Sequence, residues 1–171
     1  MGVNYLFRDV GSVEDLNRLR DHLLIQPLHY PEYEKWVIDR CIPELESGFK
    51  KVILGFYYDN LIGDIIFQEH KQLPRTCELK NMRINPNFRD KDIGHFLIRQ
   101  AEEEAKRSGK FDRVILDIDS EETGIKKFLM FCNYNILFQA PLYGKRLDII
   151  MGKELFQNNL RNYSRHSELI Q

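Results

Sequence analysis

The segment Thr76–Gly94, TCELKNMRINPNFRDKDIG, holds the most informative pattern in this chain of 171 residues. Its first part alternates like a β-strand, but four apolar positions change parity midway: Cys77, Leu79, Met82 and Ile84. Successive side chains of a strand point to opposite faces, so a change of parity needs one extra residue. We therefore predict a strand over 76–88 with a β-bulge near Lys80 and Asn81.

A basic loop and an amphipathic helix follow this strand. After the Asn85-Pro86 turn comes a loop from Arg89 to Asp92. Apolar residues then recur at helical spacing and predict a helix over 93–107: Ile93, Phe96, Leu97, Ala101 and Ala105. A helix N-terminus presents unpaired N–H groups and the positive end of the helix dipole, so this junction suits an anion such as a diphosphate.

The rest of the chain predicts an α+β fold. Further strands are expected over 5–10, 52–58, 61–69, 113–119, 136–139 and 147–153. Helices are expected over 13–24, from Pro31 to a kink or end at Pro43, and over 122–132. This mixed order predicts a mostly antiparallel sheet of six to seven strands with helices on both faces. A bulged strand over 76–88 would splay from a parallel neighbour over 113–119.

Composition narrows the class of protein. The chain is 43% hydrophobic and 30% charged, with a formal charge of -1, which is typical of soluble globular proteins. Lys and Arg are not massed on one segment, so we expect no nucleic-acid partner. No apolar run approaches the roughly 20 residues that span a bilayer, and the first residues lack a signal-peptide core, so we expect no membrane and a cytoplasmic location.

Three cysteines and five histidines are scattered, and we predict no metal site. We expect one domain over residues 1–155. For the polar tail over 156–171, the composition allows a helix, a partner contact or a frayed end. A homodimer is also possible.

The order of elements resembles the GNAT superfamily of N-acetyltransferases from about Tyr5 to Leu155. The acetyl-CoA loop of that family reads Arg or Gln, two residues, Gly, any residue, then Gly or Ala. Here the corresponding residues are Arg89, Asp90, Lys91, Asp92, Ile93 and Gly94. Asp92 replaces the first glycine and brings a carboxylate near two phosphates, although Asp tolerates unusual backbone angles better than most residues.

The resemblance implies that acetyl-CoA binds at this loop, with pantetheine threaded between the bulged strand and its parallel neighbour. The cofactor-binding residues it implies are Met82, Arg83, Ile84, Arg89, Asp90, Lys91, Asp92, Ile93, Gly94, His95 and Phe128.

Glu78 is the first candidate for the catalytic base. Many GNAT proteins have a glutamate at this place on the bulged strand, six residues before Ile84. A carboxylate can take the proton of an amine directly or through water. Glu69 and His70 are second choices, and a solvent-facing strand residue is the alternative for Glu78.

A second GNAT signature ends in aromatic-Tyr and then Gly-Phe. Matching Asn133-Tyr134 to Gly-Phe puts Leu129 at the tyrosine, and a register two residues later puts Phe131 there. The catalytic hydroxyl is missing in either register. Tyr134, although at a core position of the family, is the candidate acid, beside Tyr143 and Cys132.

The resemblance implies transfer of an acetyl group from acetyl-CoA to a primary amine of a small molecule, a protein or a peptide. The alternatives are a CoA-binding regulatory or scaffold module without turnover and an interaction domain that no longer binds CoA. Glu32, Glu34 and Asp39 mildly favour a cationic amine.

Overall fold

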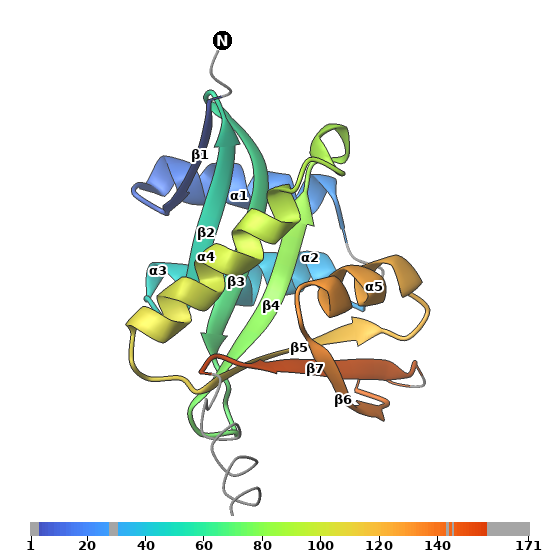
Figure 1. The fold of residues 1–171 in the computed structure, drawn as a ribbon. Helices are drawn as coiled ribbons and strands as arrows, with labels where there is room; N and C mark the ends of the chain where they lie inside the picture. Colours follow the sequence, from blue (N-terminus) through green and yellow to red (C-terminus); the bar gives the residue numbers. More distant parts are fainter. Residues whose placement is uncertain (1–3, 28–30, 143, 145, 157–171) are drawn as a thin grey trace, which may run out of the picture.

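The computed structural model describes residues 4–27, 31–142, 144 and 146–156 (Figure 1). Its strands are β1 (Tyr5–Asp9), β2 (Lys50–Tyr57), β3 (Asn60–Glu69), β4 (Thr76–Ile84), β5 (Arg113–Asp119), β6 (Asn135–Ala140) and β7 (Asp148–Glu154). Its helices are α1 (Val13–Ile25), α2 (Tyr33–Trp36), the π-helical turn η1 (Val37–Cys41), α3 (Ile42–Glu46), the 3₁₀ turn η2 (Pro86–Phe88), α4 (Ile93–Arg107) and α5 (Thr123–Phe131). Tyr143 and the tail from residue 157 onward lie outside the described residues.

The strands form one seven-stranded sheet in the order β1-β2-β3-β4-β5-β7-β6. β4 and β5 are parallel, and every other neighbouring pair is antiparallel. The mixed, mostly antiparallel α+β architecture predicted from the sequence is therefore confirmed.

Helices cover both faces of the sheet and enclose two separate cores. In Figure 1, α4 and α5 lie in front of the sheet, and α1, α2 and α3 lie behind it. The α4 side buries mainly aliphatic side chains of α4 and the central strands, among them Leu97, Ile98, Ala101, Ile65 and Val114. The other side buries the α1, α2 and η1 residues Leu19, Leu23, Tyr33, Val37 and Cys41 against β2 and β3. The two faces can therefore serve different binding tasks.

The bulge in β4 lies at the predicted place. Ile66 of β3 is opposite Asn81, and Phe67 is opposite Leu79, so Lys80 is the extra residue. This insertion puts Cys77 and Leu79, then Met82 and Ile84, against the same core. The parity change seen in the sequence is the direct result.

Gly63 lets α4 pack closely on β3. A Cβ atom at this position would lie 3.0 Å from the carbonyl oxygen of Arg83 and 3.2 Å from Leu97 Cδ1. Such a contact with backbone leaves no room for a side chain. Because Gly63 has no side chain, α4 can lie close to β3 and to the end of β4.

Three details differ from the sequence expectations. The strand expected over 76–88 ends at Ile84, and Pro86–Phe88 forms a 3₁₀ turn. The helix after Pro31 does not end at Pro43 but continues to Glu46. A π-helical turn precedes Pro43, which lies in the first turn of α3, where a proline needs no N–H partner. The β2–β3 hairpin turns at residues 58–59 rather than 59–60.

A buried polar group joins α1 to the sheet. Asp64 of β3 is fully buried; its Oδ2 accepts a hydrogen bond from Asn81 Nδ2 (2.8 Å), and its Oδ1 lies 3.6 Å from His22 Nε2. Burial raises the pKa of Asp64 to about 7, and Asn81 and the Arg83 charge oppose the rise. Burial, aided by Arg83, lowers the pKa of His22 to about 4. Between these values both groups are neutral, so they do not form an ion pair.

Asp64→Asn should stabilise the protein more at pH 8 than at pH 5. The pKa of Asp64 is higher in the folded state than its ordinary value of 3.8, so ionisation destabilises the fold increasingly from about pH 4 to pH 7. Asparagine keeps an acceptor for Asn81 and removes that cost. Thermal melts should show a gain in Tm at least about 3 °C larger at pH 8, since 1 kcal/mol is worth roughly 2–4 °C in a chain of this size.

The control is Asp59→Asn in the exposed turn after β2, which should show equal shifts at both pH values. Equal shifts for Asp64→Asn as well would contradict the raised pKa.

Candidate active site

A gap opens between β4 and β5 because the two strands pair over only a short length. Thr76, Cys77 and Glu78 are opposite Arg113, Val114 and Ile115, and the pairing ends there. From Leu116 onward, β5 is paired with β7 alone among the described strands. Figure 1 shows β4 turning away from β5 beyond this point. The gap begins at the bulge, so main-chain groups of β4 beyond Glu78 face it without a strand partner.

The loop before α4 has an unusual backbone. Asp90 and Asp92 both have a φ of 58°, in the left-handed region that favours glycine. This explains why a glycine suits the Asp92 position and why an aspartate is tolerated there. Residues 89–92 are exposed, and the Asp92 side chain does not cap the helix.

The first amides of α4 lie outside its helical hydrogen bonds. The first backbone bond of the helix runs from the N–H of Phe96 to the carbonyl of Asp92, so the N–H groups of Ile93, Gly94 and His95 precede the helical ladder. Arg89 and Lys91 are exposed beside them. Together these groups make a site for an anion at a helix N-terminus.

Predicted cofactor residues from three elements meet at Gly94. A Cβ atom there would lie 3.1 Å from Ile84 Cδ1 of β4 and 3.2 Å from Phe128 Cζ of α5. The His95 ring also contacts the Phe131 ring, with centroids 5.8 Å apart. The missing side chain of Gly94 thus makes room for these neighbours, and the α4 N-terminus packs against α5 at the open end of the gap. Met82 packs against the same core.

Arg83 was predicted with these residues, but its side chain points to the opposite face. Its Nε donates to the carbonyl of Gln26 (3.3 Å), and its guanidinium lies 6.0 Å from the centre of the Tyr33 ring. Residues that alternate along β4 must face opposite sides, so Arg83 can offer only main chain to the gap.

The Glu78 side chain lies on that opposite face. Glu78 is the last residue of β4 that pairs with β5. Its Oε2 accepts a hydrogen bond from Gln68 Nε2 (2.9 Å), and its Oε1 accepts one from Lys80 Nζ (3.0 Å). Gln68 Oε1 in turn accepts from Lys50 Nζ (2.7 Å), and Lys50 is ion-paired with Glu44. A carboxylate has about four lone-pair sites, so Glu78 can still accept a proton while this network holds it in place.

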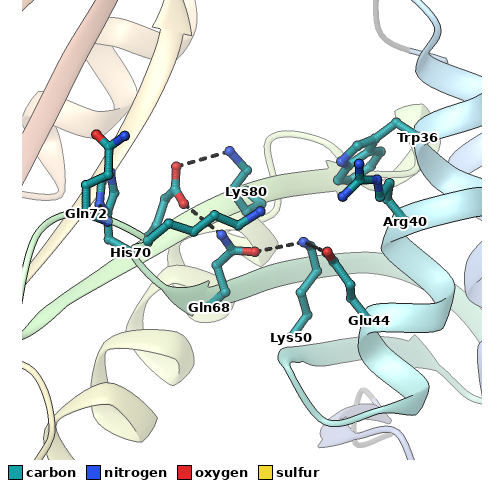
Figure 2. A pocket seen from close by; sticks show the side chains of 10 residues that line it. Trp36, Arg40, Glu44, Lys50, Gln68, His70, Gln72 and Lys80 are labelled. Atoms are coloured by element: carbon teal, nitrogen blue, oxygen red, sulfur yellow. Dashed lines mark hydrogen bonds and ion pairs between the residues drawn. The ribbon is translucent and has the colours of Figure 1, made fainter.

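The network borders a polar pocket of about 330 Å³ (Figure 2). Its lining comes from α2, η1 and α3, which together form the α2–α3 helix, from β2, β3 and β4, and from the loop between β3 and β4: Trp36, Arg40, Glu44, Lys50, Gln68, His70, Lys71, Gln72, Glu78 and Lys80. In Figure 2, Trp36 and Arg40 project from the helix, across from His70 and Gln72. Glu78 therefore has an open space beside it that can hold a second molecule.

The two second-choice bases are less well placed. His70 uses its Nδ1 to accept hydrogen bonds from the main-chain N–H groups of Gln72 (3.1 Å) and Leu73 (2.9 Å). The neutral ring then has its proton on Nε2, which leaves no free basic nitrogen. Glu69 is exposed and does not line the pocket.

Tyr134, predicted as the acid, belongs to the core instead. Only 1% of this residue is exposed, and its hydroxyl donates to Glu102 Oε1 (3.0 Å). Lys153 Nζ donates to both oxygens of Glu102. Burial and the Glu102 carboxylate raise the pKa of Tyr134 well above its ordinary value. Its hydroxyl is therefore badly placed to protonate a leaving group.

Neither register of the second signature offers a hydroxyl. Leu129 is buried with 1% exposed, and Phe131 is 74% exposed.

The sequence did not point to Lys50, Gln68, Arg40 or Trp36. Lys50 lies before the strand predicted over 52–58, and a single buried lysine has no periodic signal. Its role appears only when β2 and β3 pair and bring it opposite Gln68.

Within the described ranges, no three His, Cys, Asp or Glu side chains cluster closely enough to hold a metal ion. None of the helices in that part of the chain is both long and apolar enough to cross a membrane.

Several solved structures are similar to this fold. An aminoglycoside 6'-N-acetyltransferase complexed with coenzyme A has a TM-score of 0.73 at 19% identity, over 90% of this chain and 98% of that one. PaiA N-acetyltransferase from Thermoplasma acidophilum, in complex with coenzyme A, has a TM-score of 0.67 at 19% identity, over 88% and 99%. The ribosomal-protein-S18-alanine N-acetyltransferase from Escherichia coli has a TM-score of 0.71 at 13% identity, over 91% and 98%.

At the sequence level, no curated protein matches the chain. The sequence model of the acetyltransferase (GNAT) family matches residues 16–132, which include most of α1, the bulged strand, the loop before α4 and all of α5. With that match over more than half of its length, the chain belongs to the GNAT acetyltransferase family.

Proposed function

We propose that residues 1–155 form one cytoplasmic acetyltransferase domain, which transfers an acetyl group from acetyl-CoA to a primary amine. The observation that supports this most strongly is the end of β4–β5 pairing at Glu78. The gap starts at Glu78, whose carboxylate borders the pocket on one face of the sheet, while the N-terminus of α4 lies on the other face. Two of the similar structures contain coenzyme A, which supports acetyl-CoA as the co-substrate.

The diphosphate of the co-substrate would bind at the start of α4. The N–H groups of residues 93–95 and the positive end of the helix dipole favour an anion there. The exposed cations Arg89 and Lys91 add to that attraction. Asp92 opposes it, because it adds a negative charge at the residue directly before these amides.

The pantetheine arm would lie along β4, in the gap that faces β5. Main-chain groups beyond Glu78 can bond its amides as a strand would. Ile84, Phe128 and Met82 supply apolar surface near the α4 end. Bound there, the thioester supplies an activated acetyl carbonyl at the floor of the gap.

Glu78 would act as the general base. The amine must lose a proton as it attacks, and Glu78 can accept it directly or through one water in the pocket. Gln68 and Lys80 hold the carboxylate, and the Lys50–Glu44 pair holds Gln68. The network orients the base without using all of its lone pairs.

The departing sulfur does not require an acid from the protein. A thiol with a pKa of roughly 8.5, the value for free cysteine, leaves tolerably as a thiolate near neutral pH. The lack of a hydroxyl at residue 129 or 131 therefore slows the reaction without preventing it. It also motivates the second candidate, a CoA-binding module without turnover.

Asp92→Gly should tighten the binding of CoA. The change removes a negative charge that opposes an anion at the α4 amides, an effect worth up to about 1 kcal/mol at a helix terminus. Isothermal titration calorimetry should show a Kd lower by roughly 3- to 10-fold, the range expected for about 1 kcal/mol.

Asp90→Gly is the matched control, because Asp90 has the same φ and exposure but lies two residues farther from the helix. It should change the Kd less. An unchanged or weaker affinity for Asp92→Gly would show that its carboxylate does not face the bound phosphates.

Glu78→Gln should lower kcat for a good amine substrate by about 100-fold or more, the range typical of a lost general base. The affinity for CoA should stay within about twofold, because Glu78 is on the other face from the α4 amides. Thiol release from acetyl-CoA measures the rate, and Glu69→Gln, at the exposed last residue of β3, is the control.

Activity of Glu78→Gln within a few-fold of wild type would remove Glu78 from the mechanism. If wild type binds CoA but releases it with no amine of a broad panel, the module without turnover becomes the better account.

A further inference from the structure

The pocket beside Glu78 has an excess of positive charge, and we infer that the acceptor is a primary amine that also bears an anionic group, a carboxylate or a phosphate. This inference rests on the proposed function and names the class of acceptor. It concerns the pocket shown in Figure 2, on the face of the sheet opposite α4.

The charges of the pocket do not balance. Four basic side chains line it, against two carboxylates: Arg40, Lys50, Lys71 and Lys80, with Glu44 and Glu78. Both carboxylates are already in ion pairs, Glu44 with Lys50 and Glu78 with Lys80. The excess positive charge therefore lies with Arg40 and Lys71, which form no ion pair with any carboxylate of the described residues.

Lys71 is held close to the rest of this charge. Its Nζ lies 5.9 Å from the centre of the Phe49 ring, and Lys50 Nζ lies 5.7 Å from the same centre. The ring therefore places the Lys71 ammonium on the β2–β3 side of the pocket, where the charge of Lys50 is already offset by Glu44. Arg40 adds a guanidinium from the helix, one turn after Trp36.

An acceptor must bring its amine to Glu78 and fit its remaining groups among these cations. A carboxylate or phosphate can bind the Arg40 guanidinium in a bidentate manner and be attracted by Lys71. An acceptor with further ammonium groups would meet like charges instead, which selects against it. Trp36 is only partly buried and offers an apolar wall to the carbon skeleton.

The earlier indication of a cationic amine does not apply to this pocket. Its sources, Glu32, Glu34 and Asp39, are not among the lining residues. The volume of about 330 Å³ suits a small molecule or the end of a peptide rather than a large polymer.

Matched pairs of amines test the inference. Glutamate against glutamine, glycine against glycinamide and phosphoethanolamine against ethanolamine differ in one anionic group, and putrescine and spermidine represent cationic acceptors. Thiol release from acetyl-CoA should give a kcat/KM about 10-fold or more higher for the anionic member of at least one pair, and the preference should shrink as salt is added. The pair with the larger ratio of anionic to neutral kcat/KM shows whether the pocket prefers a carboxylate or a phosphate.

Arg40→Gln and Lys71→Gln should each remove most of this preference, mainly by raising KM for the anionic amine. The rate with the neutral member and the affinity for CoA should stay within about twofold, since neither residue touches the base or the α4 amides. Arg99→Gln on α4, an exposed cation on the other face, is the control.

Faster turnover of neutral or cationic amines, or a preference that survives both substitutions, would overturn the inference while leaving the proposed function intact. Bound CoA with no amine turned over at all would overturn the proposed function, and this inference with it.

Discussion

The extra residue in β4 is the constraint on which the rest of the site depends. Lys80 has no counterpart on β3, so the strand bends there while its earlier part stays paired with β5. β4 then continues with β3, and β5 continues with β7. A gap in an otherwise continuous sheet would be costly if the freed main-chain groups found no partner. A ligand that bonds like a strand is the natural occupant of such a gap.

The same insertion gives β4 an apolar face toward α4 and a polar face toward the pocket. Before and after the bulge, apolar residues of β4 face α4, where the helix N-terminus meets Ile84 and Phe128. The polar residues, Glu78 and Lys80 among them, face the α2–α3 helix and its pocket. The co-substrate and the acceptor would therefore approach from opposite sides and meet where β4 and β5 part. The Glu78 carboxylate borders the acceptor pocket and lies on the other face from the anion site at the α4 N-terminus.

The sequence predicted those parts that depend on local pattern. The bulge followed from a parity change, and α4 was predicted with its observed bounds. Features that depend on tertiary packing were missed. Pro43 is accommodated by a π-helical turn, Arg83 points to α1 and α2, and the Tyr134 hydroxyl is held by Glu102. The Lys50–Gln68–Glu78 network needs three strands in register, which no single segment can reveal.

Hydrogen exchange of backbone amides, with and without saturating CoA, is the most direct test of the central claim. That claim is that one ligand spans the α4 N-terminus and the unpaired edge of β4. The account predicts slower exchange at residues 93–95 and in the segment 79–84 together, with little change in α1. Protection of only one of these segments, or protection centred on α1 and α2, would contradict it.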